Sequence, residues 1–394
     1  MIMFSCSSSL ANSNFQWTGF TVRLFARSGN SQVVCRLLLG CYEKQLENQI
    51  IALRLNFFFL IFRFFSSVSL KMAPSSEIIT LTETIPSESS TSEDEPKLPE
   101  RKIVWMNVYF MSVLHLMAFY GISLLPGASP WTWFWTWLCY FIGVLGVTCG
   151  AHRLWSHRSY KATWLLRLLL MCFNCVAAQN DIFEWARDHR VHHKFSETDA
   201  DPHNAKRGFF FAHVGWLLVK KHPNVIKKGQ QLELSDLYTD EIVMFQRRHY
   251  KLLITLFNVI IPAIVPWYFW NESLLNAFMI CYAFRYAFTL NATWCVNSFA
   301  HLWGSKPYDK NINPSQNFSV VIATGGEGFH NFHHTFPQDY ATSELGVSLN
   351  PSKWFIDVCA KLGLAYDLKT VSKDTVLKRR LRTGDLQHLN NHHD

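Results

Sequence analysis

Nine of the chain's 17 histidines fall into three clusters and one single position, which together give four short motifs. The motifs are HRLWSH, HRVHH, NSFAH and HNFHH, and they contain His152, His157, His189, His192, His193, His301, His330, His333 and His334. Random placement of 17 histidines in 394 positions would give about 0.03 HxxHH windows, whereas this chain has two. Because imidazole is the side chain that most often binds metals, the motifs predict a metal site.

The HxxHH spacing places three imidazole groups on one side of a helix. Residues i, i+3 and i+4 share a face, so His189, His192 and His193 can converge on a single point, as can the histidines of HNFHH. The two histidines of HRLWSH are five residues apart and do not share an α-helical face, so this pair needs a helix end or must serve two different ions. Nine ligands exceed the four of a structural zinc site and fit two metals with open positions. Imidazole alone admits zinc, copper, nickel or iron.

Nearby carboxylates could orient the histidine rings, because a ligating imidazole usually donates its other N–H to a carboxylate. The candidates are Glu184, Asp188, Glu197, Asp199, Asp201 and Glu327. The remaining histidines have more ordinary interpretations. We expect core positions for His115, His213 and His249, turn positions beside prolines for His203 and His222, and solvated positions for His388, His392 and His393.

The elements that must position the motifs are apolar segments close to the length of about 20 residues that crosses hydrocarbon. We predict spans at about residues 104–125, 131–150, 252–270 and 273–294, which form two hairpins. Arg285 in the last span is costly in lipid and is expected to be functional, paired or near the interface. The fold class is therefore an all-α integral membrane protein, in which four transmembrane helices support a cytosolic helical cap, residues 151–251 and 295–384, holding a histidine-ligated di-metal site.

The distribution of charge indicates the orientation of the spans. Neither hairpin tip contains Lys or Arg, whereas the segment between the second and third spans is rich in both, so this segment and both termini are predicted to be cytosolic. The formal net charge of +8 is concentrated beside apolar runs, which favours contact with membrane lipid over nucleic acid. The ten cysteines are scattered, which is typical of a reducing compartment, and the CxxC pair Cys172 and Cys175 is interpreted as packing.

The two ends of the chain differ in composition from the predicted membrane domain at 102–384. Residues 1–71 are interpreted as a non-native or accessory extension before a natural start at Met72, and the alternative is a targeting segment or anchor around 55–70. Residues 72–101 are rich in Ser, Glu and Pro and predict a disordered tail. Residues 385–394 form a polar C-terminal tail.

Four stretches of the chain closely resemble motifs of one protein family, the membrane-bound stearoyl-CoA type (Δ9-like) fatty acyl-CoA desaturases of animals. The stretches are GAHRLWSHRSYKA, QNDIFEWARDHRVHHKFSETDADPHN, NATWCVNSFAHLWG and GEGFHNFHHTFPQDY, and the similarity extends over about residues 102–384. The resemblance implies a four-span protein of the endoplasmic reticulum. It implies two Fe2+ ions bound directly by the nine motif histidines, with Asn297 near one iron through a water. The implied reaction uses O2, and electrons from cytochrome b5 and its reductase, to place a cis double bond in a saturated acyl-CoA.

The resemblance also implies a bent apolar tunnel for the acyl chain. Gln179, Trp185 and Thr293 would lie at its bend, and the acyl-CoA path would include Asn107, Asn180, Arg187, Asp188, Lys220, Lys221 and Trp294. The two lysines suit phosphate groups as compact cations, and the alternative is a basic face at the membrane surface. The closed end would lie in the second span, where Tyr140 and Val144 are one helical turn apart and should set the accepted chain length.

The sequence leaves the regioselectivity, the preferred chain length and alternative functions open. Phe299, Phe329 and Phe332 depart from the residues common in the family, which concerns chain length and regioselectivity rather than the ligands. No His-Pro-Gly-Gly haem motif is present in this sequence, so the cytochrome b5 donor should be a separate protein. The alternatives are a related hydroxylase or methyl oxidase, a Δ11 regioselectivity, and a zinc transporter or scaffold. The position of the double bond, the preferred chain length and the oligomeric state are not given by the sequence.

Overall fold

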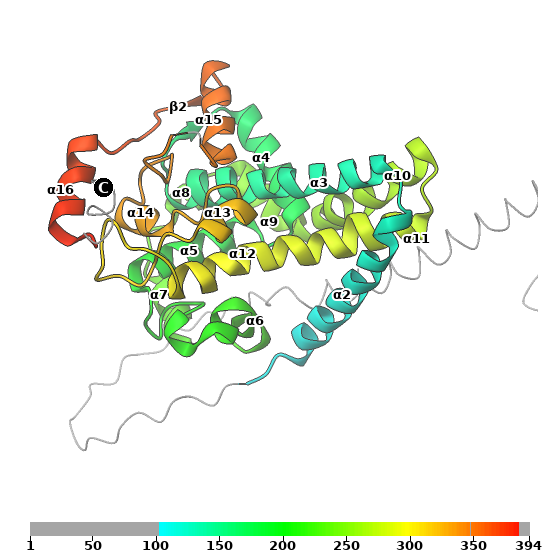
Figure 1. The fold of residues 1–394 in the computed structure, drawn as a ribbon, viewed down its shortest axis with the longest axis horizontal. Helices are drawn as coiled ribbons and strands as arrows, with labels where there is room; N and C mark the ends of the chain where they lie inside the picture. The colour runs from blue at the N-terminus through cyan, green and yellow to red at the C-terminus, as the bar shows by residue number, and fades with distance from the viewer. Residues whose placement is uncertain (1–101, 347, 386–394) are drawn as a thin grey trace, which may run out of the picture. The chain divides into compact units, whose positions relative to one another are not determined.

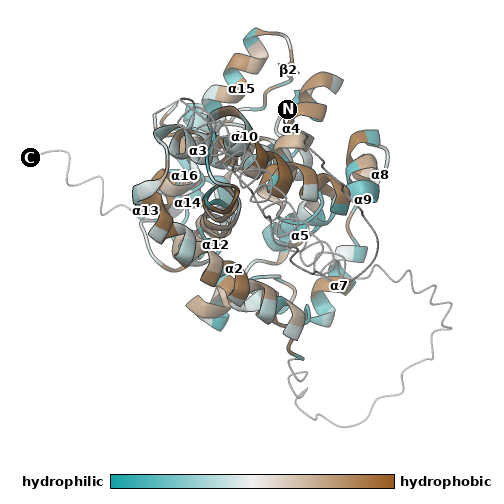
Figure 2. Ribbon diagram, turned by 90° about the vertical axis from the view of Figure 1, so that its right-hand side faces the viewer, coloured by the Kyte–Doolittle hydropathy of each residue, from teal (hydrophilic) through white to brown (hydrophobic). Residues whose placement is uncertain are grey.

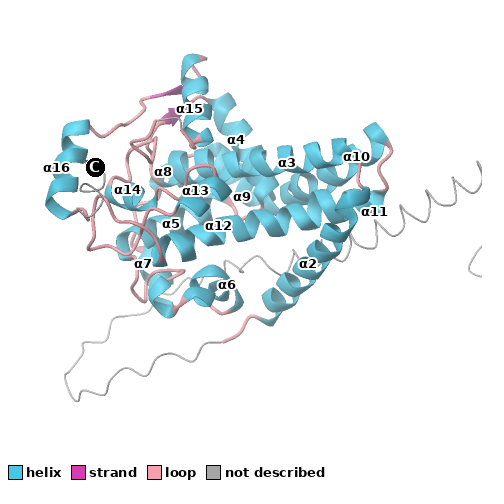
Figure 3. Ribbon diagram, viewed as in Figure 1, coloured by secondary structure: helices cyan, strands magenta, loops and turns pink. Residues whose placement is uncertain are grey.

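The computed structural model describes residues 102–346 and 348–385. The predicted extension 1–71, the acidic tail 72–101 and residues 386–394 of the C-terminal tail lie outside the described residues. In the described part, the regular secondary structure is almost entirely helical, and one short antiparallel pair joins β1, Lys161–Ala162, to β2, Ala365–Tyr366 (Figure 3). An all-helical fold agrees with the prediction.

The first hairpin consists of α2, Trp105–Leu124, and α3, Pro130–Leu145, and α3 continues as η2, Gly146–Ser156. Pro130 occupies the first turn of α3, and the Ser129 side chain accepts a hydrogen bond from Trp131 N, so this helix begins with both a favourable proline and a polar cap. The turn between the helices contains η1, Leu125–Gly127. The helix of the second predicted span therefore runs past Gly150 to Ser156.

The second hairpin begins earlier than predicted, because its first helix starts at Glu241 rather than near residue 252. This helix comprises α9, Glu241–Ile254, η5, Thr255–Ile260, and α10, Ile261–Trp270. The returning helix comprises α11, Leu274–Ala277, η6, Phe278–Phe284, and α12, Arg285–Leu302. Glu272, in the tip, accepts hydrogen bonds from Ser129 N at 3.0 Å and Thr132 Oγ1 at 2.7 Å, which join the two hairpin tips.

Three helices in the described residues are long and apolar enough to cross a membrane: Trp105–Gly127, Pro130–Ser156 and Glu241–Trp270. The predicted fourth span is helical but is not among them, because Asn276, Arg285 and Asn291 interrupt its apolar run. The pair α4, Trp164–Ala177, and α5, Ile182–Phe195, qualifies only if taken together, and it is bent by 82°. The described residues thus contain three or four candidate membrane helices.

Arg285 is one of the most deeply buried side chains in the bundle. Its guanidinium donates to the carbonyl oxygens of Cys281, Val176 and Asn258 at 2.8 to 3.0 Å, and to Asn258 Oδ1 at 2.8 Å. It is therefore paired, as the sequence suggested, but its acceptors are amide and carbonyl oxygens rather than a carboxylate.

The outer faces of the bundle helices expose large apolar side chains. On α2, Leu116 and Phe119 are 68% and 67% exposed, and on α10 Tyr268 and Phe269 are 70% and 72% exposed. Figure 2 shows hydrophobic residues along α2. A bundle that was surrounded by water would bury such residues, so this exposure fits a lipid environment.

The remaining helices gather at one end of the bundle and form the cap (Figure 1). They are α4, α5, η3 at Ala205–Arg207, η4 at Phe211–Gly215, α6 at Trp216–Leu218, α7 at Pro223–Gln230, α8 at Ser235–Tyr238, α13 at Phe318–Thr324, α14 at His330–Thr335, α15 at Pro351–Lys361 and α16 at Lys373–Thr383. At Gly146 a Cβ atom would lie 2.2 Å from Asn174 N of α4. The backbones of η2 and α4 therefore touch, which is possible only because residue 146 lacks a side chain.

Candidate metal centre

The nine motif histidines form two groups whose ring nitrogens face one another. The five-histidine group contains His152, His157, His189, His193 and His333, and the four-histidine group contains His192, His301, His330 and His334. In each group the ligand atoms lie within 4.8 Å of one another. The rings come from η2, α5, α12 and α14, four segments that are far apart in the sequence. The fold therefore assembles two separate sets of nitrogen donors.

The HxxHH motifs do not each converge on one point, so that expectation was wrong. On α5, His189 and His193 belong to the five-histidine group, whereas His192 belongs to the four-histidine group. On α14 the division is reversed, because His333 belongs to the five-histidine group, whereas His330 and His334 belong to the four-histidine group. The physical reason is that positions i+3 and i+4 lie about 100° apart around a helix, enough to direct their rings to two different points.

The pair His152 and His157 belongs to a single group, which rules out the alternative that it serves two ions. Residues 146–156 are wound as a π-helix, and His157 N donates to His152 O at 3.0 Å across five residues. In a π-helix this spacing is close to one turn, so the two side chains point in similar directions. His157 also lies at the end of this helix, as the other alternative required.

The spacing of the nitrogen atoms fits bound metal ions better than hydrogen bonds. His333 Nε2 lies 2.9 Å from His152 Nε2 and 2.9 Å from His193 Nε2, and His330 Nε2 contacts two neighbouring ring nitrogens at 2.9 and 3.1 Å. A ring nitrogen has one in-plane position, for either a proton or a lone pair, so it cannot make two such hydrogen bonds at once. Two nitrogens bound at right angles to one ion, each about 2.1 Å from it, would lie about 3.0 Å apart.

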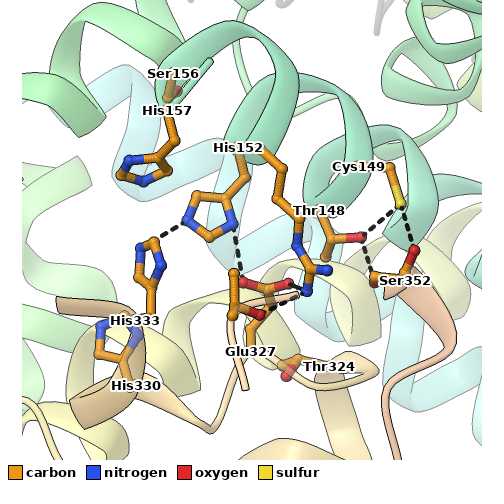
Figure 4. A network of polar contacts seen from close by, with 12 residues as sticks. Thr148, Cys149, His152, Ser156, His157, Thr324, Glu327, His330, His333 and Ser352 are labelled. Carbon is orange, nitrogen blue, oxygen red and sulfur yellow. Dashed lines mark hydrogen bonds and ion pairs between the residues drawn. The ribbon is translucent and has the colours of Figure 1, made fainter. Parts of the chain in front are cut away.

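Three of the six candidate carboxylates contact a motif histidine. Glu327 Oε2 lies 2.9 Å from His152 Nδ1 (Figure 4), Asp201 Oδ1 lies 2.9 Å from His192 Nδ1, and Glu197 Oε1 lies 2.7 Å from His301 Nδ1. In each case Nδ1 faces the carboxylate, which leaves Nε2 directed at the other histidines.

These carboxylates are held in the charged form. Burial alone would raise the pKa of Glu327, but the positive charge of Arg153 and the contact with His152 outweigh it and lower the pKa to about 2. The pKa of Asp201 is also lowered, because its contact with His192 outweighs the effect of burial. A negative charge at Nδ1 makes the opposite ring nitrogen a better donor to a cation.

The other three candidate carboxylates do not orient a ring. Asp199 is exposed to solvent. Glu184 and Asp188 instead accept hydrogen bonds from Lys221 Nζ at 3.1 and 2.5 Å, and both also pair with Arg187. The ion pairs therefore form a separate charged cluster on the neighbouring face of α5.

Two cavities border the histidine groups. The larger, of about 680 Å³, is lined by Asn107, Asn180, Asp188, Lys220, Lys221 and Trp294 among other residues. The smaller, of about 60 Å³, is lined by Tyr140 and Val144 among other residues. Both cavities share Gln179, Trp185, His189, Thr293 and Asn297. The structure thus brings together all but one of the predicted substrate residues, and the exception is Arg187, which lines neither cavity.

The shared residues form the junction between the cavities. Gln179 Nε2 donates to Thr293 Oγ1 at 2.8 Å, and the Trp185 ring stacks on His189 with centroids 4.9 Å apart. In the smaller cavity, Val144 packs with Tyr140 and Ala292, and the Tyr140 hydroxyl donates to Ala323 O of α13.

Comparison with known proteins agrees with this arrangement. The fatty acid desaturase family model matches residues 129–346. The chain belongs to the fatty acid desaturase family. It is 56% identical to bovine (Bos taurus) stearoyl-CoA desaturase 5 over 72% of this chain and 84% of the relative. It is 58% identical to the acyl-CoA desaturase of Cyprinus carpio over 75% of this chain and 91% of the relative, and 56% identical to human (Homo sapiens) stearoyl-CoA desaturase over 74% and 82%.

Two residues of this desaturase family member were missed in the sequence. His203 does lie in a turn, as predicted, but its ring is largely buried, packs on His192 with centroids 4.3 Å apart, and lines the larger cavity. Burial lowers the pKa of His203 to about 3, so the ring is neutral. Its position two residues after Asp201 was the signal that could have found it. The other is Arg153, whose partners are distant in the sequence.

Proposed function

We propose that this protein is an acyl-CoA desaturase that inserts a cis double bond at the Δ9 position of saturated fatty acyl-CoA. The main support is that both histidine groups border the same cavity. His152 and His189 of one group, and His192 and His330 of the other, line the smaller cavity. An acyl chain extending through both cavities would therefore pass one segment beside both groups. The relatives, named stearoyl-CoA desaturase and acyl-CoA desaturase, support the substrate class.

We infer that the two groups bind two Fe2+ ions, with the nine histidines as ligands and Asn297 near one of them. Bound iron supplies the one-electron and O2 chemistry that removal of hydrogen from an unactivated methylene requires. The chain itself holds the rings in place. Asp201 and Glu197 orient two rings of the four-histidine group, and Glu327 orients one ring of the five-histidine group.

The junction of the cavities would set the shape of the substrate. Gln179 and Thr293 are held together by their hydrogen bond at this point, so the acyl chain would bend around them. A bent chain already has the geometry of a cis product, so less distortion is needed during the reaction. The apolar walls on both sides would exclude water from the oxidation.

The ends of the cavities would select the two ends of the substrate. Tyr140 and Val144 would stop the methyl end of the acyl chain and so limit its length. At the other end, Asn107, Asn180 and Trp294 would contact the thioester region. Lys221 is already paired with Glu184 and Asp188, whereas Lys220 is exposed, so Lys220 is the better candidate to contact phosphate groups of the coenzyme. Arg187 and Asp188 would stabilise this region through their ion pairs.

We further infer that residues 102–384 form one desaturase domain in the endoplasmic reticulum membrane, with four spans and cytosolic termini. The three apolar helices, and the exposed apolar side chains of the bundle, support a membrane location. The fourth span would be the helix that contains α12. Cytochrome b5 and its reductase would supply electrons as separate proteins, and the basic cap offers a surface for an acidic donor.

Expression in a yeast strain that lacks its own desaturase tests the proposal. Membrane fatty acids are converted to methyl esters, and mass spectrometry locates the double bond. We expect Δ9 monounsaturated products from the wild type and none from His333→Ala at equal membrane abundance. Hydroxylated chains would instead assign a hydroxylase, and a double bond at Δ11 would correct the regioselectivity. Iron-loaded protein that forms neither product would contradict the proposal.

A further inference from the structure

Arg153 follows the proposed ligand His152 directly, and its side chain is fully buried. Nη1 donates to Tyr340 O at 2.9 Å, and Nη2 donates to Glu327 Oε1 at 2.8 Å and Thr342 Oγ1 at 2.8 Å. The exposed fraction of the Arg153 side chain is 0%. A buried guanidinium is costly unless its donors are paired, so these contacts must hold it in one conformation.

The same carboxylate joins Arg153 to the metal centre. Glu327 contacts Arg153 through Oε1. Its Oε2 lies 2.9 Å from the His152 ring (Figure 4). Because both carboxylate oxygens are engaged, rotation of the Glu327 side chain would break one contact or the other. The position of Oε2, and hence the angle of the His152 ring, therefore depends on what holds Oε1.

The backbone around Glu327 is shaped to fit this arrangement. Asn350 Oδ1 lies 3.5 Å from Arg153 Nη2, and the Asn350 amide donates to Ala341 O at 2.7 Å. Gly326 has a φ of +113°, and a Cβ atom there would lie 3.0 Å from Asn350 Oδ1. The residue before Glu327 must therefore be glycine to place the carboxylate beside Arg153 while leaving space for Asn350.

We propose that Arg153 is a positioning residue that fixes Glu327, and through it the His152 ring, by connecting both to Tyr340 and Thr342. This inference rests on the proposed function, because it assigns Arg153 a role at the iron centre. The planar fork of arginine is essential, since one side chain must reach a carbonyl oxygen, a carboxylate and a hydroxyl at fixed angles. Lysine would keep the charge but could not satisfy these three acceptors together.

The competing explanation is that Arg153 only stabilises the fold. Arg285 provides a control, because it is 1% exposed and its guanidinium is hydrogen-bonded to oxygens of Cys281, Val176 and Asn258 rather than to a carboxylate beside a histidine. Arg153→Lys and Arg285→Lys should both lower the thermal unfolding temperature. Only Arg153→Lys should weaken iron retention.

The test measures iron per polypeptide, and the rate of iron loss to a chelator, for purified full-length protein. We expect Arg153→Lys to lose iron about tenfold faster than the wild type, and Arg285→Lys to lose it at the wild-type rate. Thr342→Val removes one acceptor without changing the side-chain shape. It should accelerate iron loss about threefold, which is less than the effect expected when a residue that contacts a ligand directly is replaced. In the Glu327→Gln background, Arg153→Lys should add little, because the two act in series.

Each outcome decides between the explanations. If Arg153→Lys and the wild type lose iron equally fast, or if both lysine variants accelerate loss equally, Arg153 is structural only. If Arg153→Lys does not accumulate as folded protein, a wild-type rate for Thr342→Val overturns the inference. A wild-type protein that binds no iron would overturn the proposed function, and the inference with it, whereas iron-binding wild type with unaffected variants would overturn the inference alone.

Discussion

The two histidine groups lie side by side but are supported differently. In the four-histidine group, two of the four rings face a carboxylate, His192 through Asp201 and His301 through Glu197. In the five-histidine group, Glu327 is the one carboxylate that the described residues place on a ring. Carboxylates that orient ligating histidines raise ligand basicity and metal affinity. The four-histidine group should therefore hold its ion more firmly, even though it has fewer nitrogens.

The carboxylates of the two groups also differ in how far along the sequence they lie from the histidines that they contact. The four-histidine group receives its carboxylates from one short segment, because Glu197 and Asp201 both follow α5, and Glu197 N donates to Asp201 Oδ2 at 2.9 Å. The five-histidine group depends on Glu327, which comes from the segment before α14. Its support is therefore long-range, and it depends on Arg153 and the loop beyond α14. A site with long-range support should be the more easily disturbed of the two.

The largest effect is expected when one central ligand is removed from either group. His333→Ala and His330→Ala each remove a nitrogen that contacts two others, so desaturation should fall by about two orders of magnitude or more. Iron per polypeptide should fall from two towards one. His249→Ala serves as the control, because His249 is exposed rather than in the core position predicted, and it lies outside both groups. Retention of two irons by either alanine variant would contradict the assignment of that ligand.

The carboxylates provide a direct comparison between the groups. Glu327→Gln should accelerate iron loss to a chelator by about tenfold to 100-fold, because the five-histidine group has no second carboxylate in the described residues. Asp201→Asn should have a smaller effect, since Glu197 still orients His301. Chelator kinetics for two irons should resolve a fast and a slow phase. If Asp201→Asn affected the fast phase more than Glu327→Gln did, the proposed order of stability would be wrong.

A smaller effect is expected at the mouth of the larger cavity. Lys220→Ala should raise the apparent KM for acyl-CoA about threefold, because an exposed charge–phosphate contact contributes less than about 1 kcal/mol. The turnover number and the iron content of both groups should remain unchanged. Steady-state kinetics with microsomal membranes measures this, and Lys227→Ala on α7 is a suitable nearby control. An altered iron content would show that Lys220 acts on the metal centre instead.

The smallest effect on reaction rate is expected at the proposed closed end of the smaller cavity, where a substitution should instead change the chain length of the products. Val144→Ala enlarges the smaller cavity near Tyr140, so the preferred substrate should become longer. Gas chromatography of products from mixed chain lengths measures the shift, with Val147→Ala on the same cavity as the comparison. Neither histidine group should lose iron. An unchanged product profile would place the length limit elsewhere.

The sequence predicted which histidines the fold brings together but not how they divide into two groups. Eight of the nine histidines were identified from three clusters, whereas His301 stands alone in NSFAH, and the structure brings all nine together. Their division between two groups depends on ring directions around α5 and α14, which the i, i+3, i+4 pattern does not resolve. The π-helical winding that unites His152 and His157 was equally hidden, because the sequence pattern of residues 146–156 does not distinguish it from an α-helix.

Long-range contacts were the other features that the sequence could not give. Arg153 and Glu327 are 174 residues apart, and only the folded chain brings them together. The membrane helices were located from their apolar composition, but the third begins earlier than predicted because α9 is amphipathic and its polar first turns obscured the helix start. The fourth remains a proposal, since polar residues such as Arg285 lower its hydropathy.

The packing around Val144 would connect the limit on acyl-chain length with the rate of turnover. A Cβ atom at Gly325 would lie 3.6 Å from Val144, and Gly325 is only two residues before Glu327. The Tyr140 hydroxyl also holds the end of α13 through Ala323. An acyl chain that is too long would press on the same short segment that supports the His152 ring. Discrimination against such chains should therefore appear as slower turnover as well as weaker binding, so that the enzyme rejects a misfit even after it has been bound.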